Sequence, residues 1–448
     1  MNNIVWIIAI MVLNMANKAV AWHNWAGNQV CESTQIIIPS SKKELQESIS
    51  KAVRENKKIR AYGSGHSWSD IVCTDAYLID TSKLNNVLSL DKKAGKIRVQ
   101  AGIKLKDLVA YLAKHGLALP NQPAVLDQSI AGTLATATHG TGHTGTLADF
   151  VTEVELIAAD GTSYLLSAQQ EPDLFAASRV SIGSLGMVYA VTVHCEPSFM
   201  LEYRSEKDTL AAIKKKYKKL HQENDFFQFY IDPYSGDVSS DIWNRVTGNR
   251  TSGWLSKVRE TAGRWGSSIV EPLLNWSPRL QRAATRWSVR ASKNSNIKPS
   301  YKALSGVPGA LYFEQEISVP VSQLDVALDA TLKLLKEYEK KDIFVSTVLI
   351  RFVNAEHNSL LSPVAERNSA YVSVIVPAAD GYEQLYRDMY HAVMPFGGRP
   401  HWGKINFLTK EDAQKAYGDN FEKFIAVRKQ LDPNGVLSNA FTKRVFGW

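Results

Sequence analysis

The sequence predicts an α+β protein of more than one domain, and three observations support this. The chain has 448 residues, more than a single hydrophobic core usually holds. Its composition is that of an ordinary folded protein, with 45% hydrophobic and 21% charged residues. Between about residues 35 and 196, short strand-like runs alternate with amphipathic helical patterns and glycine turns. We therefore expect one α+β domain over this region and a second domain after it.

The first predicted helix begins at a capping sequence. Ser41 is followed three residues later by Glu44, and the helical pattern continues to about Asn56. A strand is expected next, from Lys58 to Tyr62. Further strands are predicted at residues 78–80, 96–100, 151–158 and 187–194.

A histidine between glycine and serine follows the predicted strand, in the run Arg60-Ala61-Tyr62-Gly63-Ser64-Gly65-His66-Ser67-Trp68-Ser69. The two glycines let the backbone come close to a ligand. Exposed N–H groups and the three serine hydroxyls could bind a phosphate, while His66 offers an imidazole. The loop therefore suggests a nucleotide site, although a tight turn with an incidental histidine would have the same sequence.

The region from about residue 201 to 370 is predicted to be a second, substrate-binding domain, with strands at residues 345–353 and 371–376. Its middle part is irregular and basic, and tryptophans recur every eleven residues at Trp243, Trp254, Trp265, Trp276 and Trp287. Such a segment suits peripheral membrane contact or a partner protein, but we favour core packing of these rings.

The charge balance excludes one class of partner. The chain has 52 basic and 44 acidic residues, a net charge of +8, which favours anionic ligands. No compact run has the density of a nucleic-acid module, so no nucleic acid is expected. The densest run, residues 214–219, is interpreted as the solvated face of an amphipathic helix whose apolar side carries Ile213 and Tyr217.

The cysteines indicate neither a metal site nor a disulfide framework. Cys31, Cys73 and Cys195 are odd in number and lack metal-ligand spacing, so buried thiols are expected.

The amino terminus resembles an export signal. An apolar run of ten residues from Ile4 to Leu13 is too short to span a bilayer, and Ala19-Val20-Ala21 has the small-x-small form of a cleavage site before Trp22. Residues 1–21 are therefore predicted to be a signal peptide, with a short membrane anchor as the alternative. The expected location is exported, periplasmic or secreted, or membrane-associated.

Several separated motifs, in order, resemble the aldonolactone oxidases, flavoproteins of the vanillyl-alcohol oxidase type. They are the histidine loop, Ala101-Gly102, His115-Gly116-Leu117-Ala118-Leu119, Thr138-His139-Gly140-Thr141-Gly142, Arg399-Pro400-His401-Trp402-Gly403-Lys404 and Leu431-Asp432-Pro433-Asn434-Gly435. The resemblance implies a two-subdomain FAD-binding (PCMH-type) domain at 22–200, an α+β cap at 201–370, and a C-terminal segment, 371–448, that returns to the flavin.

The resemblance also implies the cofactor site. The FAD-binding residues would be Gly63, Ser64, Gly65, His66, Ser67, Ser69, Ser129, Gly132, Thr138, His139, Gly140 and Gly142. By the same resemblance, His66 is joined covalently to the 8α-methyl group of the flavin. Residues 128–140 are poor in large side chains, which permits close approach to an extended dinucleotide; a tightly packed helix followed by a turn would give the same pattern.

Oxidation of a carbinol requires a site that withdraws a hydroxyl proton and stabilises negative charge at the N1 edge of the reduced flavin. The resemblance puts Lys404 beside N1 and His401 near the ring or substrate. It also implies a Glu-x-Arg pair on a strand facing the substrate, but this chain reads Leu349-Ile350-Arg351. Leucine can neither accept a proton nor bind a sugar hydroxyl. Glu316 could replace the missing carboxylate, or the substrate has fewer hydroxyls. Arg351 would bind substrate or pair with a carboxylate inside the cap.

The expected activity is FAD-dependent oxidation of a sugar-1,4-lactone or related polyol, with dioxygen as acceptor and hydrogen peroxide as product. Two alternatives stay open. One is a dehydrogenase that uses a cytochrome or quinone. The other is a flavoprotein without turnover that serves as a binding partner, an idea that the loss of the carboxylate at Leu349 supports.

Overall fold

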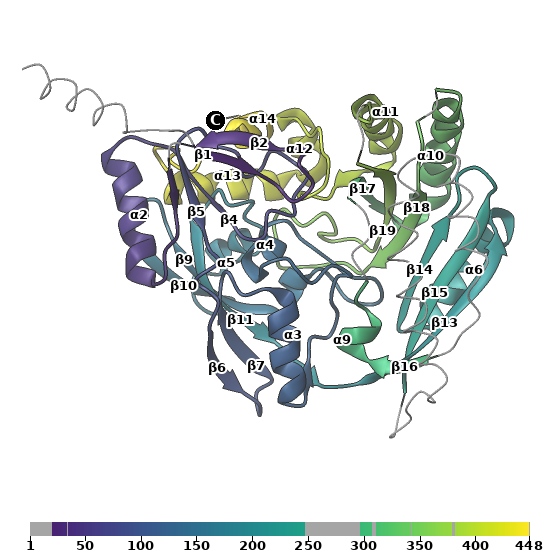
Figure 1. The fold of residues 1–448 in the computed structure, drawn as a ribbon, viewed down its shortest axis with the longest axis horizontal. Helices are drawn as coiled ribbons and strands as arrows, with labels where there is room; N and C mark the ends of the chain where they lie inside the picture. Colours follow the sequence, from purple (N-terminus) through teal and green to yellow (C-terminus); the bar gives the residue numbers. More distant parts are fainter. Residues whose placement is uncertain are drawn as a thin grey trace, which may run out of the picture.

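The computed structural model describes residues 20–33, 35–246, 296–306, 311–341, 343–378 and 381–447, and Figure 1 shows two units side by side. The first unit is formed mainly by residues 20–197 and by the C-terminal helices. The second, the cap, is built on an eight-stranded sheet. Among the described residues, no helix is both long enough and apolar enough to cross a membrane.

A small parallel sheet of order β3-β5-β4 holds the histidine loop at its edge. Its strands are β3 (Gln35–Ile37), β4 (Ile59–Tyr62) and β5 (Tyr77–Asp80), and α2 (Lys42–Arg54) precedes β4. The predicted helix and strands are confirmed. Ser41 caps α2 by accepting from the N–H of Glu44, but the Glu44 carboxylate bonds the N–H of Ser40 rather than that of Ser41. The N-terminal bond pattern is therefore shifted by one residue from a standard capping box.

A five-stranded antiparallel sheet of order β10-β9-β11-β7-β6 forms the other part of the first unit. Its strands are β6 (Val87–Asp91), β7 (Lys96–Gln100), β9 (Val151–Ile157), β10 (Ser163–Ser167) and β11 (Met187–His194). The strands predicted at 96–100, 151–158 and 187–194 are confirmed. The helical and short elements of this unit are α3 (Leu105–Lys114), α4 (Ile130–Ala135), η1 (Leu147–Phe150), α5 (Pro172–Ser178), β8 (Leu117–Ala118) and β12 (Glu196–Pro197).

The cap sheet has the strand order β16-β13-β15-β14-β18-β19-β17-β20. Its strands are β13 (Met200–Thr209), β14 (Phe226–Ile231), β15 (Asp237–Val246), β16 (Asn296–Pro299), β17 (Tyr312–Pro320), β18 (Thr347–Val353), β19 (Ser369–Pro377) and β20 (Arg399–Pro400). Strand β19 crosses the predicted boundary at residue 370, so the sheet extends into the segment that was assigned to the C-terminal part.

Helices cover one face of the cap sheet. They are α6 (Leu210–Glu223), α10 (Leu324–Glu339) and α11 (Glu383–Val393), and Figure 1 shows α10 and α11 beside the strands. Alternate residues of each strand, such as Phe229 and Phe352, pack beneath these helices, as the twofold period of a strand requires. The intervening residues, including Arg351 and Glu316, form what we call the inner face of the sheet. The remaining cap elements are α9 (Ser300–Ala303), η2 (Val321–Gln323) and η3 (Met394–Phe396).

The basic run at 214–219 lies on α6 as predicted, with Ile213 and Tyr217 buried beneath it. Lys214 and Lys216 form ion pairs with Asp329 and Asp208. This is the solvated helix face expected from the sequence.

The chain then returns to the first unit through α12 (Lys410–Tyr417), α13 (Asp419–Leu431) and α14 (Ala440–Phe446), drawn yellow in Figure 1. Asp432 accepts hydrogen bonds from the N–H groups of Val436 and Leu437 and so folds the Leu-Asp-Pro-Asn-Gly turn. Arg60, which is buried, donates to the carbonyl of Leu437 at 2.8 Å. The C-terminal turn is thus fixed to the strand that carries the histidine loop.

An N-terminal hairpin, β1 (Val20–His23) and β2 (Val30–Ser33), lies over the histidine loop. The rest of the predicted signal segment, residues 1–19, lies outside the described residues, as do Trp254, Trp265, Trp276 and Trp287. Trp243 is buried in β15, in agreement with the core-packing interpretation. All three cysteines are free thiols; Cys195 is buried, while Cys31 and Cys73 are only half-buried.

Candidate active site

A cavity of about 210 Å³ lies where the histidine loop meets the inner face of the cap sheet. The first unit and the cap both contribute walls. The predicted site residues that line it are Gly63, Ser64, Gly65, His66, Ser67, Ser129, Gly132, Thr138, His139, Glu316, Arg351, His401 and Lys404. Most of the residues chosen from separate motifs are thus brought to one place.

Three predicted residues lie elsewhere. Ser69 donates its hydroxyl to the carbonyl of Trp402, so it fixes the Arg-Pro-His-Trp-Gly-Lys turn rather than the cavity wall. Gly142 donates its N–H to the carbonyl of Phe352, with φ at +117°, and connects its loop to the cap. Gly140 borders a second cavity instead.

His66 lines the cavity and packs against an aromatic ring, a contact that the sequence did not predict. The ring of Trp25, from the N-terminal hairpin, lies 5.1 Å from the imidazole, and the Trp25 N–H donates to the carbonyl of Gly65 at 2.8 Å. Gly65 has φ of +64°, which a side chain would disfavour. Burial lowers the pKa of His66, so its neutral, nucleophilic form is favoured.

The small-residue segment approaches the histidine loop closely. A Cβ atom at Gly63 would lie 1.8 Å from the Ser129 hydroxyl oxygen, and one at Gly132 would lie 3.0 Å from the same atom. Ser129 caps α4 by accepting from the Gly132 N–H. The segment is therefore a short helix followed by a turn, and its glycines keep two walls of the cavity together.

Lys404 and Arg351 form ion pairs with two carboxylates of the inner face of the sheet. Lys404 Nζ pairs with Glu314, and Arg351 Nη2 lies 2.6 Å from Oε1 of Glu316 and 3.8 Å from Oε1 of Glu314. Both carboxylates are almost fully buried, at 3% and 0% exposure. Burial opposes ionisation of Glu316, but the charge of Arg351 holds its pKa well below the usual range. The sequence left two roles open for Arg351, substrate binding and pairing with a carboxylate of the cap. The guanidinium is paired with Glu316, and it also lines the cavity.

Glu314 was missed by the sequence reasoning. It lines the cavity, pairs with Lys404, and accepts a hydrogen bond from the hydroxyl of Ser373. The sequence contained evidence for Glu314, because Glu314 and Glu316 are two residues apart in a strand-like run and therefore lie on the same face. Leu349, also on this wall, is next to Ser373 in the β18–β19 register.

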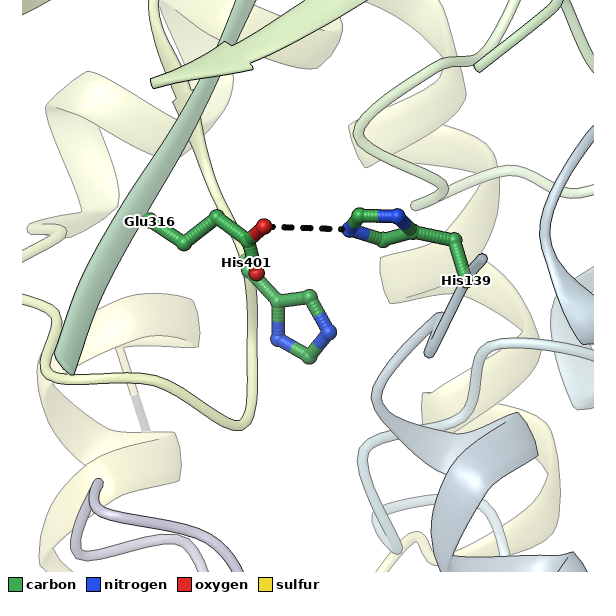
Figure 2. A group of neighbouring side chains, drawn as sticks. All are labelled: His139, Glu316 and His401. Carbon is green, nitrogen blue, oxygen red and sulfur yellow. Dashed lines mark ion pairs between the residues drawn. The ribbon is translucent and has the colours of Figure 1, made fainter. Parts of the chain in front are cut away.

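His139, Glu316 and His401 form a buried cluster whose ligand atoms lie within 4.8 Å of one another (Figure 2). His139 Nδ1 lies 2.8 Å from the carbonyl oxygen of Gly140, so Nδ1 carries a proton and donates it. His401 Nδ1 accepts from the N–H of Gly403, so a neutral His401 carries its proton on Nε2. Burial lowers the pKa of His401 well below its usual value.

The cluster of two histidines and one glutamate has the composition of a metal site, but the positive charges around it favour binding of a proton over binding of a divalent metal ion. Oε1 of Glu316 is already bound to the Arg351 guanidinium, and Lys404 lies nearby. A divalent ion would add two positive charges next to two existing cations. The Nε2 atom of His139 and the Oε2 atom of Glu316 are buried without a hydrogen-bond partner, so the cluster has unused capacity for a proton or a substrate hydroxyl.

The residues present fit an extended dinucleotide such as FAD. The glycines of the histidine loop and of the 128–140 segment leave space where a Cβ would clash, and Gln128 presents a buried carbonyl oxygen without a partner. Small polar residues of both segments and charged groups such as Lys404 line the same cavity. A combination of small polar groups and fixed charges is what a flavin with its ribityl chain requires.

Comparison with known proteins agrees with this fit. Residues 33–167 match the model of an FAD-binding domain family. The fold is similar to a crystal structure of cholesterol oxidase from Brevibacterium sterolicum, with a TM-score of 0.73 at 18% identity, covering 96% of this chain and 97% of that one. The fold is therefore the two-subdomain FAD-binding fold with a cap, and the class of protein is an FAD-binding flavoprotein.

The family is also defined. Residues 191–445 match the model of the D-arabinono-1,4-lactone oxidase family. The chain is 33% identical to an L-gulono-1,4-lactone dehydrogenase of Mycobacterium tuberculosis, covering 95% of this chain and 99% of the relative. It is 34% identical to an L-gulonolactone oxidase of Mus musculus, with 96% and 99% covered. The chain belongs to the D-arabinono-1,4-lactone oxidase family, and the resemblance inferred from the motifs is confirmed.

Proposed function

We propose that this protein oxidises a secondary alcohol next to the carbonyl of an aldono-1,4-lactone, or of a related polyol, and passes the electrons to dioxygen. The observation that supports this most directly is that two buried ion pairs, Lys404 with Glu314 and Arg351 with Glu316, line one cavity together with the histidine loop. Fixed charges beside a flavin-binding loop suit a substrate with several hydroxyl groups and a carbonyl.

When bound, FAD supplies the acceptor for the hydride that leaves the carbinol carbon. Lys404 contributes a fixed positive charge where negative charge would accumulate, and it is held over the Trp68 ring at 4.4 Å. Its partner Glu314 keeps the buried ammonium compensated before the reaction.

His139 is the best candidate for the proton acceptor. Its Nδ1 proton is committed to the Gly140 carbonyl, which leaves Nε2 as the basic nitrogen, buried at the cavity wall. As the carbinol O–H breaks and the C=O bond forms, this atom takes the proton. Glu316 Oε1, 3.6 Å away, then faces the N–H of an imidazolium and stabilises it.

Glu314 takes the place of the carboxylate that the family resemblance implied at Leu349. Both side chains lie on the inner face of the sheet, and Ser373 stands between their strands. The Ser373 hydroxyl donates to Glu314. The carboxylate therefore lies two strands away from Leu349 in the sheet, but it still lines the cavity. Its role would be to accept a substrate hydroxyl.

We further propose that His66 carries the flavin covalently. The lowered pKa of His66 favours an uncharged imidazole, which has a nitrogen lone pair available for a bond to the 8α-methyl carbon. That bond would replace one C–H bond of the methyl group; this hydrogen and the imidazole N–H proton would leave the flavin reduced by two electrons, and dioxygen would reoxidise it with release of hydrogen peroxide. Trp25 and the Gly65 turn restrict where the imidazole ring can point.

The experiment that tests the function is anaerobic mixing of the flavin-loaded protein with L-gulono-1,4-lactone or D-arabinono-1,4-lactone, followed by air. We expect bleaching at about one lactone per flavin, then rapid recovery with one hydrogen peroxide per lactone oxidised. Two electrons and two protons leave each lactone and reduce one dioxygen to one hydrogen peroxide. Recovery only with a dye or quinone would identify a dehydrogenase. Absence of bleaching with every lactone and polyol tried would contradict the enzyme proposal.

We propose, finally, that the chain is exported and cleaved after Ala21. Cleavage would leave Trp22 as the first residue, and its ring packs against Tyr62 at 5.5 Å. Amino-terminal sequencing of the protein recovered from the medium or periplasm tests this; an intact Met1 in the purified protein would refute it.

A further inference from the structure

A second cavity of about 260 Å³ adjoins the candidate active site on the cap side. The two cavities share Ala124 and Arg351 in their walls. The carbonyl of Ala124 accepts from the N–H of Gly306, which closes this part of the wall next to α9. Because Arg351 lines both cavities, a group bound beside its guanidinium is within reach of the second cavity.

The floor of this second cavity continues the polar inner face of the cap sheet. Gln228 is in register with Arg351 on one side and with Asp241 on the other. The Gln228 amide donates to the hydroxyl of Tyr230 at 2.7 Å and to Asp241 at 3.3 Å. A single row of polar side chains therefore runs from the reaction site into the second cavity.

Aromatic rings and a carboxylate complete the walls. Tyr203 donates its hydroxyl to Asp241 at 2.7 Å, and its ring lies 5.5 Å from that of Trp243. All three residues line the cavity together with Tyr230. Burial raises the pKa of Asp241, although the hydrogen bonds from Tyr203 and Gln228 oppose this. Among the described residues, the hydrogen bonds to the Asp241 carboxylate come from the neutral side chains of Tyr203 and Gln228, and Lys298 and Lys302 line the same cavity.

We propose that this second cavity is a carbohydrate subsite that binds one sugar unit attached to the lactone, beyond the ring that is oxidised. This rests on the proposed function. Aromatic rings bind the apolar faces of a sugar, while a carboxylate and an amide bind its hydroxyls. An apolar group would desolvate Asp241 and Gln228 without new partners, so the cavity discriminates against apolar alcohols. The preferred substrate is therefore an aldonolactone with a glycosidically linked sugar.

The binding test needs no turnover. Methyl α-D-glucoside is titrated calorimetrically into the flavin-loaded protein and into the Asp241→Asn and Tyr230→Phe variants. The matched control is Asp325→Asn, because Asp325 also accepts from a tyrosine hydroxyl, that of Tyr217, but on the helix-covered face of the sheet. We expect binding to the parent and the control, and at least tenfold weaker binding to Asp241→Asn.

A kinetic arm uses L-gulono-1,4-lactone and its glucosylated derivative. We expect Asp241→Asn to raise KM for the glucosylated lactone at least tenfold, with kcat changed less than twofold and KM for the simple lactone little affected. Glucoside binding without lactone oxidation would contradict the proposed function but support the subsite. Lactone oxidation with equal KM values for the glucosylated lactone in the parent and Asp241→Asn would contradict the subsite but support the proposed function. If Asp241→Asn fails to fold in a melting experiment, unchanged glucoside binding by Tyr230→Phe overturns the proposal.

Discussion

Nε2 of His139 lies 3.6 Å from Oε1 of Glu316, and both side chains are 1% exposed. The His139 ring also stacks on Tyr371, with ring centroids 3.9 Å apart. The imidazole is thus fixed by stacking, by the Gly140 carbonyl and by a carboxylate, which leaves it few alternative orientations.

His139→Asn removes the proposed proton acceptor. We expect anaerobic flavin reduction by lactone to slow by about 10²- to 10⁴-fold, the range of general-base catalysis, in stopped-flow measurements. Glu316→Gln retains the imidazole but removes the anion that stabilises its protonated form. The rate of flavin reduction should then fall, but by less than in His139→Asn. A rate identical to that of the parent would show that the two groups are not coupled in catalysis.

Lys404→Met should reduce the rate of flavin reduction by about 10²- to 10³-fold, comparable to the loss of one oxyanion-stabilising donor. It also removes the closer of the two cations paired with the buried Glu314 and leaves only Arg351 Nη2 at 3.8 Å, which should lower the free energy of unfolding by about 3 kcal/mol, the lower end of the range for breaking a buried ion pair. The double variant Lys404→Met/Glu314→Gln separates these effects. We expect it to regain stability in a melting curve but not the rate. Recovery of both would mean that Lys404 acts only through folding.

Leu349→Glu would restore the family sequence but introduce a third carboxylate facing Ser373 on the inner face. Because Arg351 is committed to Glu316 and Lys404 to Glu314, the new charge has no free cation within this cluster. We expect a lower melting temperature and no gain on lactones. Leu349→Glu/Glu314→Val moves the carboxylate instead of adding one and should recover both stability and activity. A gain from Leu349→Glu alone would contradict the assignment of Glu314.

His66→Ala should change how the flavin is held. Acid precipitation of the parent is expected to leave the yellow colour with the polypeptide, whereas the variant should release all of it and retain measurable lactone turnover. A matched control, His23→Ala, alters an exposed histidine of the N-terminal hairpin and should behave like the parent. Complete release of flavin from fully loaded parent protein would refute covalent attachment.

His221 predicts a pH dependence of stability. Burial, reinforced by the charge of His143, lowers its pKa to about 4, below the value of 6.5 expected in the unfolded chain. Since the unfolded state binds the proton more tightly, stability falls as the pH decreases from 6.5 toward 4. The loss is on the order of 2 kcal/mol after allowance for solvent screening.

Urea denaturation at several pH values measures this effect. His221→Phe should flatten the dependence over that interval, because phenylalanine can occupy the stack on Phe352 without titrating. The control is His194→Asn at the exposed end of β11, which should leave the slope unchanged. An equal slope in His221→Phe and the parent would exclude His221 as the source.

Local sequence signals were sufficient for many elements of the fold. The strand-like runs Lys96–Gln100 and Met187–His194 predicted strands with the observed bounds, and Ser41 marked the start of α2. The boundary between cap and C-terminal segment could not be found in this way, because β19 and β20 join the cap sheet through pairing with β17, which is distant in sequence. Strand partners are chosen by the packing of whole faces, and a single strand's pattern does not identify its neighbours.

The sequence by itself determined the family, the FAD-binding fold and most of the residues around the cavity, because these glycines and histidines and Lys404 belong to short motifs that occur in a fixed order along the chain. Only the tertiary structure decided which charges are paired. Glu314 and Lys404 are ninety residues apart, and Arg351 and Glu316 are thirty-five apart, so nothing local records these contacts. The same is true of Trp25 over His66 and of the second cavity beyond Arg351. The physical reason is that buried charge is tolerated only where an opposite charge reaches it through the folded chain, and the close packing that brings the two together is a property of the whole fold.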